Sequence, residues 1–308
     1  MAATLMADGC YEFTNVPEIA DVTTMGELLG ALGVTSTVDG NRRGVLRLEN
    51  RGTVSPVAPY ELVERIRASI VVLGPLLARF GTARVSMPGG DDFGKRPIDM
   101  HLKGLEALGA TFELRRGYIE GHADALHGAD ITLDFPSVGA TENIVMAAAL
   151  AKGPTVLDNA AREPEIADLC MMLNSMGACI EGVGSPTLYI HGVPQSELVP
   201  VNHAVVPDRV QAATYDISRA VLGGMVWALE HPNEGIVEAD EIDFHRLLEI
   251  QLPYLRPVKG FYTDWTPLDG RPGFFPEDID TSDPWQFRNI LVRSGDAPIT
   301  AKPELTKD

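Results

Sequence analysis

The sequence predicts an α/β fold made of repeated units of about 70 residues, each with a helix, a strand, a turn, a second helix and further strands. The first observation is that helix patterns rich in small residues end at glycine and run directly into strand patterns. The glycines that end these helices are Gly9, Gly81, Gly153 and Gly223. The second observation is a segment that closes the second helix with a glycine cap, at Gly33, Gly109 and Gly177.

The first helix and strand of each unit follow from the hydrophobic pattern. The expected helices are residues 1–9, 60–81, 141–153 and 211–223, and the expected strands are residues 10–14, 82–87, 154–158 and 225–229. In the second of these helices, leucine and isoleucine recur at helical spacing, so that face is expected to be core. Pro75 is expected to kink the same helix, because proline lacks a backbone donor.

Alternating patterns predict outer strands later in the units, for example in residues 111–114 and 188–190. Met1 already falls within a helix pattern, so the first unit is expected to be truncated. Residues 1–206 are therefore predicted to form one domain of three units. Residues 207–308 are predicted to form a partial and diverged second domain with an irregular tail, because the repeat fades after Pro232.

The chain is acidic, with a formal net charge of -18 at pH 7 and a pI of about 4.7. This charge argues against nucleic acid and anionic membranes as general partners. No signal peptide pattern opens the chain, and the most apolar stretch, residues 66–80, contains arginine and proline, so a cytoplasmic location is expected. Cys10, Cys170 and Cys179 lack metal-ligand spacing and are expected to be small buried residues.

A loop at residues 87–100 carries the groups best suited to chemistry. Its proline and glycines predict irregular backbone, and Asp91, Asp92, Lys95, Arg96 and Asp99 bring acids and bases together within it. A carboxylate held beside cations suits proton transfer to an anionic substrate. Taken alone, the segment also fits an ordinary solvated turn.

Further motifs accompany this loop. They are Arg-Ala-Ser at 67–69, Pro-Gly-Gly-Asp at 88–91, Gly-Lys-Arg-Pro-Ile-Asp-Met-His at 94–101, Phe-Pro-Ser-Val-Gly-Ala-Thr-Glu-Asn at 135–143, Asn-Ala-Ala-Arg-Glu-Pro-Glu at 159–165 and Pro-Asp-Arg at 207–209. Together with the repeat, these motifs resemble the UDP-N-acetylglucosamine 1-carboxyvinyltransferase (MurA) family of the enolpyruvyl transferases. The resemblance is close up to residue 224, and after it only Gly-Phe-Tyr-Thr-Asp at 260–264 is similar to a family motif.

The resemblance implies an inside-out α/β fold, in which each domain has three units with helices inside and sheets outside and substrates bind between the domains. It also implies transfer of enolpyruvate from phosphoenolpyruvate to the 3-hydroxyl of UDP-N-acetylglucosamine with release of phosphate, the first committed step of peptidoglycan synthesis. These two small molecules are the expected partners. No metal or organic cofactor is expected, and the protein is expected to be a monomer.

Three catalytic roles are implied by the same resemblance. Asp91 matches the general acid that protonates the phosphoenolpyruvate methylene, where most members have cysteine and some have aspartate. To donate a proton, this aspartate needs a raised pKa in a closed, dry site. The missing thiol predicts insensitivity to the epoxide antibiotic fosfomycin. Arg96 matches a residue beside the substrate phosphates and carboxylate, and Asp264 matches the carboxylate that takes the hydroxyl proton.

The other matched positions are implied in substrate binding. Guanidinium groups suit bidentate recognition of anions, and backbone N–H groups at a helix entrance hold diphosphate without net positive charge. Residues 97–100 match a uridine-binding strip, and Arg209 matches a position at the interdomain hinge. The substrate-binding set is Arg67, Arg96, Pro97, Ile98, Asp99, Met100, Phe135, Pro136, Ser137, Val138, Gly139, Arg209 and Asp264. His101 is expected to support its neighbours rather than to catalyse.

Other interpretations stay open. Arg67 also fits a side chain that extends from the core edge to water, residues 137–141 fit a simple helix start, and Asp264 fits a surface loop. The family carries a Lys-Asn pair upstream of the position of Met1 and further units after Asp264, and neither is recognisable in this sequence. The hypotheses are an enolpyruvyl transferase of this family, a non-catalytic UDP-sugar-binding fragment or relative, and a transferase for another nucleotide acceptor.

Overall fold

The computed structural model describes residues 1–89, 98–232, 246, 249 and 250. Contacts divide the chain into two units, Met1–Ala212 and Ala213–Asp308. The sequence placed the boundary slightly earlier, after residue 206, and the interpretation of these units as domains stays a prediction. Among the described residues, no helix is both long and apolar enough to cross a membrane.

The first repeat forms a four-stranded sheet on one side of the unit Met1–Ala212. Its elements are η1 (Ala2–Leu5), β1 (Gly9–Thr14), α1 (Ala20–Leu32), β2 (Val34–Val38) and β3 (Leu46–Asn50). The strand order is β11-β1-β3-β2, in which β3 is antiparallel to both neighbours. One edge strand, β11 (Asn202–Ala204), comes from much later in the chain and pairs with β1 in parallel.

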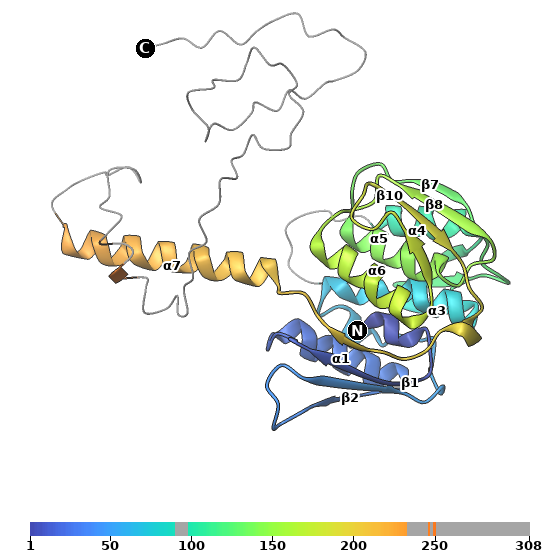
Figure 1. The fold of residues 1–308 in the computed structure, drawn as a ribbon, viewed down its shortest axis with the longest axis horizontal. Coiled ribbons are helices and arrows are strands. Elements are labelled where there is room, and N and C mark those ends of the chain that lie inside the picture. Colours follow the sequence, from blue (N-terminus) through green and yellow to red (C-terminus); the bar gives the residue numbers. More distant parts are fainter. Residues whose placement is uncertain (90–97, 233–245, 247–248, 251–308) are drawn as a thin grey trace, which may run out of the picture. The chain divides into compact units, whose positions relative to one another are not determined.

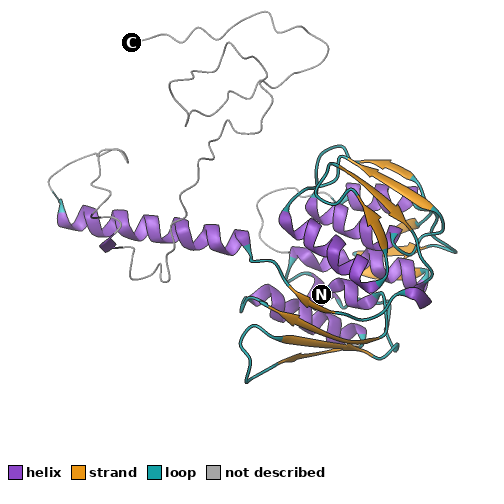
Figure 2. Ribbon diagram, viewed as in Figure 1, coloured by secondary structure: helices purple, strands orange, loops and turns teal. Residues whose placement is uncertain are grey.

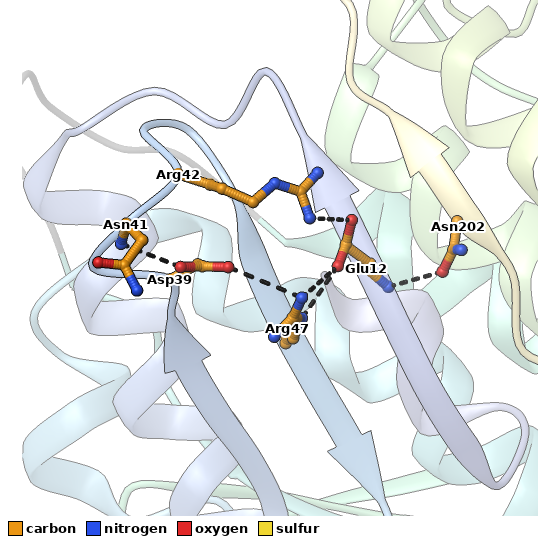
Figure 3. A network of polar contacts seen from close by, with 6 residues as sticks. All are labelled: Glu12, Asp39, Asn41, Arg42, Arg47 and Asn202. Carbon is orange, nitrogen blue, oxygen red and sulfur yellow. Dashed lines mark hydrogen bonds and ion pairs between the residues drawn. The ribbon is translucent and has the colours of Figure 1, made fainter.

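A polar network fastens β11 to this sheet (Figure 3). The carboxylate of Glu12 on β1 accepts hydrogen bonds from Arg42 and Arg47, with N–O distances of 2.9 Å to each. These bonds hold the pKa of Glu12 below its usual value. The backbone N–H of Glu12 donates to Oδ1 of Asn202 at 3.2 Å, so one residue joins both neighbouring strands.

The second repeat forms a three-stranded antiparallel sheet in the order β4-β6-β5. Its elements are α2 (Tyr60–Val63), η2 (Arg67–Val72), α3 (Leu73–Phe80), β4 (Thr82–Ser86), α4 (Asp99–Ala107), β5 (Thr111–Arg115) and β6 (Tyr118–His122).

The third repeat forms a four-stranded sheet in the order β7-β8-β10-β9, in which β7 and β8 are parallel and the other pairs are antiparallel. Its elements are β7 (Asp130–Thr132), α5 (Val138–Ala148), β8 (Pro154–Asp158), α6 (Pro164–Met176), β9 (Cys179–Glu181), β10 (Thr187–His191) and η3 (Gln195–Glu197).

Helices occupy the interior of the unit Met1–Ala212 and the sheets lie outside them, as Figure 2 shows. At the centre is α5, which packs against η2, α3, α4 and α6. Its buried residues are Ala140, Thr141, Asn143, Ile144, Val145, Met146, Ala147 and Ala148. The strands bury alternate residues, so one face of each sheet meets the helices and the other faces solvent. This architecture confirms the predicted inside-out α/β fold.

The glycine caps are confirmed. Gly33, Gly109 and Gly177 all adopt left-handed backbone, with φ values of 107°, 101° and 113°. A residue with a Cβ atom would be strained there, which explains why glycine ends these helices.

Two helix predictions are corrected in detail. Residues 1–9 contain only the short 3-10 helix η1, and residues 60–81 divide into α2, η2 and α3 instead of one kinked helix. Pro75 lies in the first turn of α3, where its missing N–H group is tolerated. The core face was predicted well, because Ile66, Ile70, Leu73 and Leu77 are all buried.

The predicted strand at residues 225–229 is wrong. A single helix, α7 (Arg209–Glu230), runs through it. Gly223 and Gly224 remain inside this helix, and neither adopts the positive φ that would make it a cap. The cysteine prediction is also partly wrong, because only Cys170 is buried. Cys10 and Cys179 are exposed, each on the outward face of a strand.

Candidate active site

The start of α4 carries three of the predicted uridine-binding residues. Ile98 and Met100 are buried, with 6% and 5% of their surface exposed, and belong to the hydrophobic core. Asp99, the first residue of α4, is exposed and lies 3.6 Å from the ammonium group of Lys103. Lys103 also pairs with Asp134 at 3.2 Å. This pair ties α4 to the segment that leads into α5.

The entrance to α5 has the form expected of an anion site. Ser137 is the N-cap, and its Oγ accepts from the backbone N–H of Ala140 at 3.4 Å. The N–H groups of Val138 and Gly139 belong to the first turn, which has no intrahelical acceptors, and they carry the positive end of the helix dipole. Phe135, just before this entrance, is 57% exposed.

Asn143, one turn further into α5, fixes three neighbours. Its Oδ1 accepts from the backbone N–H of Gly74 at 2.8 Å, and its Nδ2 donates to the carbonyl oxygen of Ile70 at 3.0 Å. Nδ2 also lies 2.8 Å from Nδ1 of His101. A single buried amide therefore joins η2, α3, α4 and α5.

His101 is buried on α4, with 6% of its surface exposed. Its pKa falls to about 4, chiefly because burial disfavours the imidazolium, with a further lowering by the charge of Arg67 and an opposing effect of Asp99. The hydrogen bonds of Asn143 to Ile70 and His101 hold η2, which begins at Arg67, beside the part of α4 that carries His101. The expectation that His101 supports its neighbours agrees with these contacts.

The structure thus brings His101, which follows residues 98–100, against Gly139 at the entrance of α5, and the contacts of Asn143 bring η2, which begins at Arg67, to the same region. Four other predicted site residues, namely Asp91, Arg96, Pro97 and Asp264, lie outside the described residues. Their roles stay predictions.

Arg209 has a different environment. It forms two hydrogen bonds with the carboxylate of Glu165 on α6, at 3.1 and 2.8 Å. Both residues line a cavity of about 440 Å³ that does not include Arg67, Asp99 or Ser137. The described structure therefore does not bring Arg209 into the group around His101.

The same cavity contains Glu142, which sequence reasoning did not select. Burial raises the pKa of Glu142 to about 7, the amino group of Met1 opposes this rise, and Glu165 adds to it. Such a carboxyl can hold or release a proton near neutral pH. Its sequence signal is weak, because Glu142 is recognisable only as the one charged residue of α5. In residues 1–89 and 98–232, no group of three or more acidic, histidine or cysteine residues is arranged to hold a metal ion.

Comparison with known proteins gives one family match. The family model for EPSP synthase (3-phosphoshikimate 1-carboxyvinyltransferase) matches residues 1–240 of the chain.

Several curated relatives are UDP-N-acetylglucosamine 1-carboxyvinyltransferases. A UDP-N-acetylglucosamine 1-carboxyvinyltransferase from Myxococcus xanthus is 50% identical over 226 residues, which cover 73% of this chain and 53% of that protein. One from Geotalea uraniireducens is 41% identical over 309 residues, which cover 97% of this chain and 70% of that protein. The chain thus spans about half the length of several curated relatives that it matches.

Solved structures show the same fold. The enolpyruvyl transferase NikO from Streptomyces tendae aligns with a TM-score of 0.62 and 26% identity, over 70% of this chain and 50% of that one. EPSP synthase from Acinetobacter baumannii aligns with a TM-score of 0.52 and 20% identity over 71% of this chain and 50% of that one, which supports the fold alone.

Proposed function

The chain belongs to the EPSP synthase family of 1-carboxyvinyltransferases, and from this premise we propose that it transfers enolpyruvate from phosphoenolpyruvate to the 3-hydroxyl of UDP-N-acetylglucosamine. Curated relatives that are 50% and 41% identical to the chain bear the name UDP-N-acetylglucosamine 1-carboxyvinyltransferase, which supports this substrate. The proposal includes a cytoplasmic location and a place in peptidoglycan synthesis.

The observation that carries the proposal is the group formed by Arg67, Asp99, His101 and the α5 entrance. It combines a guanidinium, a helix N-terminus and a buried imidazole in a chain with a net charge of -18. An anionic substrate approaching such an acidic protein needs local donors of this kind. A nucleoside diphosphate has the charge and the acceptor oxygens that these donors suit.

The proposed chemistry needs one acid and one base beyond this binding group. Asp264 takes the proton of the 3-hydroxyl as its oxygen bonds to the enol carbon, and Asp91 protonates the methylene. The C–O bond to the phosphoryl group then breaks, and phosphate leaves with the proton that Asp264 took up. One methyl proton returns to Asp91, so the product keeps its double bond and both carboxyl groups regain their starting states. Arg96 and Arg67 bind the phosphate and carboxylate charges, and Arg209 is a further proposed substrate-binding residue.

Phosphate release tests this proposal directly. The purified chain is given phosphoenolpyruvate and UDP-N-acetylglucosamine, and calorimetry in parallel measures binding of the nucleotide sugar alone. Turnover that disappears in Asp91→Asn supports the transferase and the role of Asp91. Replacing UDP-N-acetylglucosamine by other nucleotide sugars tests the acceptor, since turnover with a different one would correct the substrate.

A non-catalytic UDP-sugar-binding protein is the second candidate. One observation favours it: the described anion-binding groups all lie within Met1–Ala212, whereas the proposed base, Asp264, lies in the other unit. Nucleotide binding without phosphate release would support this candidate and would exclude the transferase for this chain.

A further inference from the structure

Strand β2 forms one edge of its sheet (Figure 1). An open edge attracts further strands unless it is short, charged or covered. Among the described sheets, the edge strands β7, β9 and β11 have only three residues each, and β5 carries Glu113 and Arg115. Residues 56–58 cover β4 through two backbone hydrogen bonds with Arg84. β2 has five residues, none of them charged or proline, so its free edge can accept another strand.

The sequence of β2 reads the same in both directions, Val-Thr-Ser-Thr-Val. Two copies of the strand that pair in antiparallel around Ser36 are related by a twofold axis, which is the commonest symmetry of homodimers. In this register, valine lies opposite valine and threonine lies opposite threonine. β-branched residues suit paired strands, and threonines on facing strands can form a hydrogen bond. β2 is therefore complementary to itself.

Strand β3 gives the same twofold arrangement complementary charges. Glu49 of β3 lies beside Thr35, and Arg47 lies beside Thr37. Pairing around Ser36 places Thr35 of one copy opposite Thr37 of the other, so Glu49 of the first copy and Arg47 of the second lie in the same row of side chains. Their backbones are three strand spacings apart, about 14 Å. The two charges therefore favour this approach of the copies without forming an ion pair.

A groove of about 580 Å³ lies beside β2, between this strand and α1. Gly26 and Gly30 of α1 line the groove, and a Cβ atom built on Gly30 would meet no atom within 4 Å. Val38 lines the same groove and is 72% exposed. Antiparallel pairing around Ser36 places Val34 of a second copy opposite Val38, on the same face of the sheet. The groove therefore has room on the side from which α1 of the second copy would approach.

We propose that β2 and this groove form an interaction surface for a second copy of the chain. The two β2 strands pair in antiparallel around Ser36 and join their sheets into one continuous sheet. The two α1 helices pack against each other across the groove, where Gly26 and Gly30 allow their backbones to approach closely. Each copy covers Val38 of the other. This dimer departs from the monomer expected from the family resemblance, and it does not depend on the proposed function.

Sedimentation equilibrium of the full chain tests whether the dimer exists. The measurement is made at about 0.15 M salt, which screens the repulsion between two chains of net charge -18. The protein is used at about 0.1 mM, a concentration at which even a dimer with a micromolar Kd is formed. The expected mass is twice the chain mass of 33.2 kDa. The mass of a single chain under these conditions overturns the proposal.

Two substitutions test whether this surface holds the dimer together. Gly30→Lys and Val38→Lys leave an exposed lysine in the single chain but enclose its charge in the dimer, so each should raise the dimer Kd at least about tenfold. Gly224→Lys and Leu114→Lys are the matched controls, because Gly224 is a helical glycine with open space around it and Leu114 is 70% exposed on the edge strand β5. Melting temperatures show whether each variant folds. A dimer that resists both test variants, or is weakened equally by the controls, overturns the proposal.

Disulfide crosslinking tests the register of the two strands. Thr35→Cys and Thr37→Cys are made separately in a chain that also carries Cys10→Ser and Cys179→Ser, which remove the exposed thiols of the described residues. A mixture of the two variants, oxidised with glutathione disulfide, should form a crosslinked dimer because the two positions face each other, with Cβ atoms about 5 Å apart. Each variant alone should crosslink several-fold less, since its own two thiols are diagonal neighbours about 7–8 Å apart. Equal crosslinking in the mixture and in the single variants, or none in the mixture, overturns the proposal.

Discussion

Replacing Asn143 by alanine should destabilise the unit Met1–Ala212 strongly. The substitution leaves three buried groups without their partner: the N–H of Gly74, the carbonyl of Ile70 and Nδ1 of His101. Each buried group left unpaired costs about 1–3 kcal/mol. Because His101 can regain a proton once the amide is gone, we expect a total of about 3–5 kcal/mol. That is a large share of the stability of an ordinary domain.

Urea unfolding followed by far-UV circular dichroism measures this loss. Asn174→Ala is the matched control. The side-chain amide of Asn174 also forms two hydrogen bonds of 2.8 Å with backbone groups, the carbonyl and the N–H of Ile180, but Asn174 is exposed. Water can replace its partners, so the control should lose only about 1 kcal/mol. Equal losses of stability in the two variants would refute the argument that the buried hydrogen bonds of Asn143 hold η2, α3, α4 and α5 together.

Three further predictions concern other parts of the chain. Fosfomycin should leave the wild-type chain unmodified in mass spectrometry, whereas Asp91→Cys should gain one covalent adduct; an adduct on the wild type would show that another group reacts. Burial raises the folded-state pKa of Glu142 from 4.5 to about 7, so the stability given by its protonated form is fully present below pH 4.5 and is lost as the pH rises through 7. Glu142→Gln should therefore gain roughly 3 kcal/mol over the wild type between pH 4.5 and 8, measured by urea unfolding, and parallel pH curves would contradict the shift. Gly74→Ala should lower stability by at least about 2 kcal/mol, because its Cβ would collide with the backbone oxygen of Asn143; an unchanged melting temperature would mean that α3 can move away from α5.

The sequence predicted the structure best at positions where the backbone conformation suits only one residue type. Gly33 and Gly177 were predicted as helix caps because only glycine adopts their backbone freely, and the structure agrees. The same argument failed at Gly223, which was predicted to end a helix. A glycine inside a helix is tolerated at a modest cost in stability, and α7 continues through this position.

The candidate site was predicted in part. The helix entrance at Ser137 was found because a capping residue and small neighbours form a local signal. Asn143 and Glu142 were missed as site residues because their importance arises from tertiary contacts. Gly74 and Ile70, which form hydrogen bonds with Asn143, precede it by about seventy positions, and no local sequence pattern predicts such a contact. Ile98 and Met100 were matched to a uridine-binding strip; both are buried at the start of α4, and their role in binding stays a prediction.

The parallel pairing of β1 with β11 has a consequence for synthesis of the protein. Glu12 and its partner Asn202 are separated by 190 positions, so a ribosome working at about 5–20 residues per second makes β11 roughly 10–40 s after β1. During that time, one edge of β1 has no strand beside it and can pair with another nascent chain. Until β11 is made, this part of the sheet already carries charged side chains, those of Glu12, Arg42 and Arg47. Charged residues near an open strand edge discourage pairing with another chain.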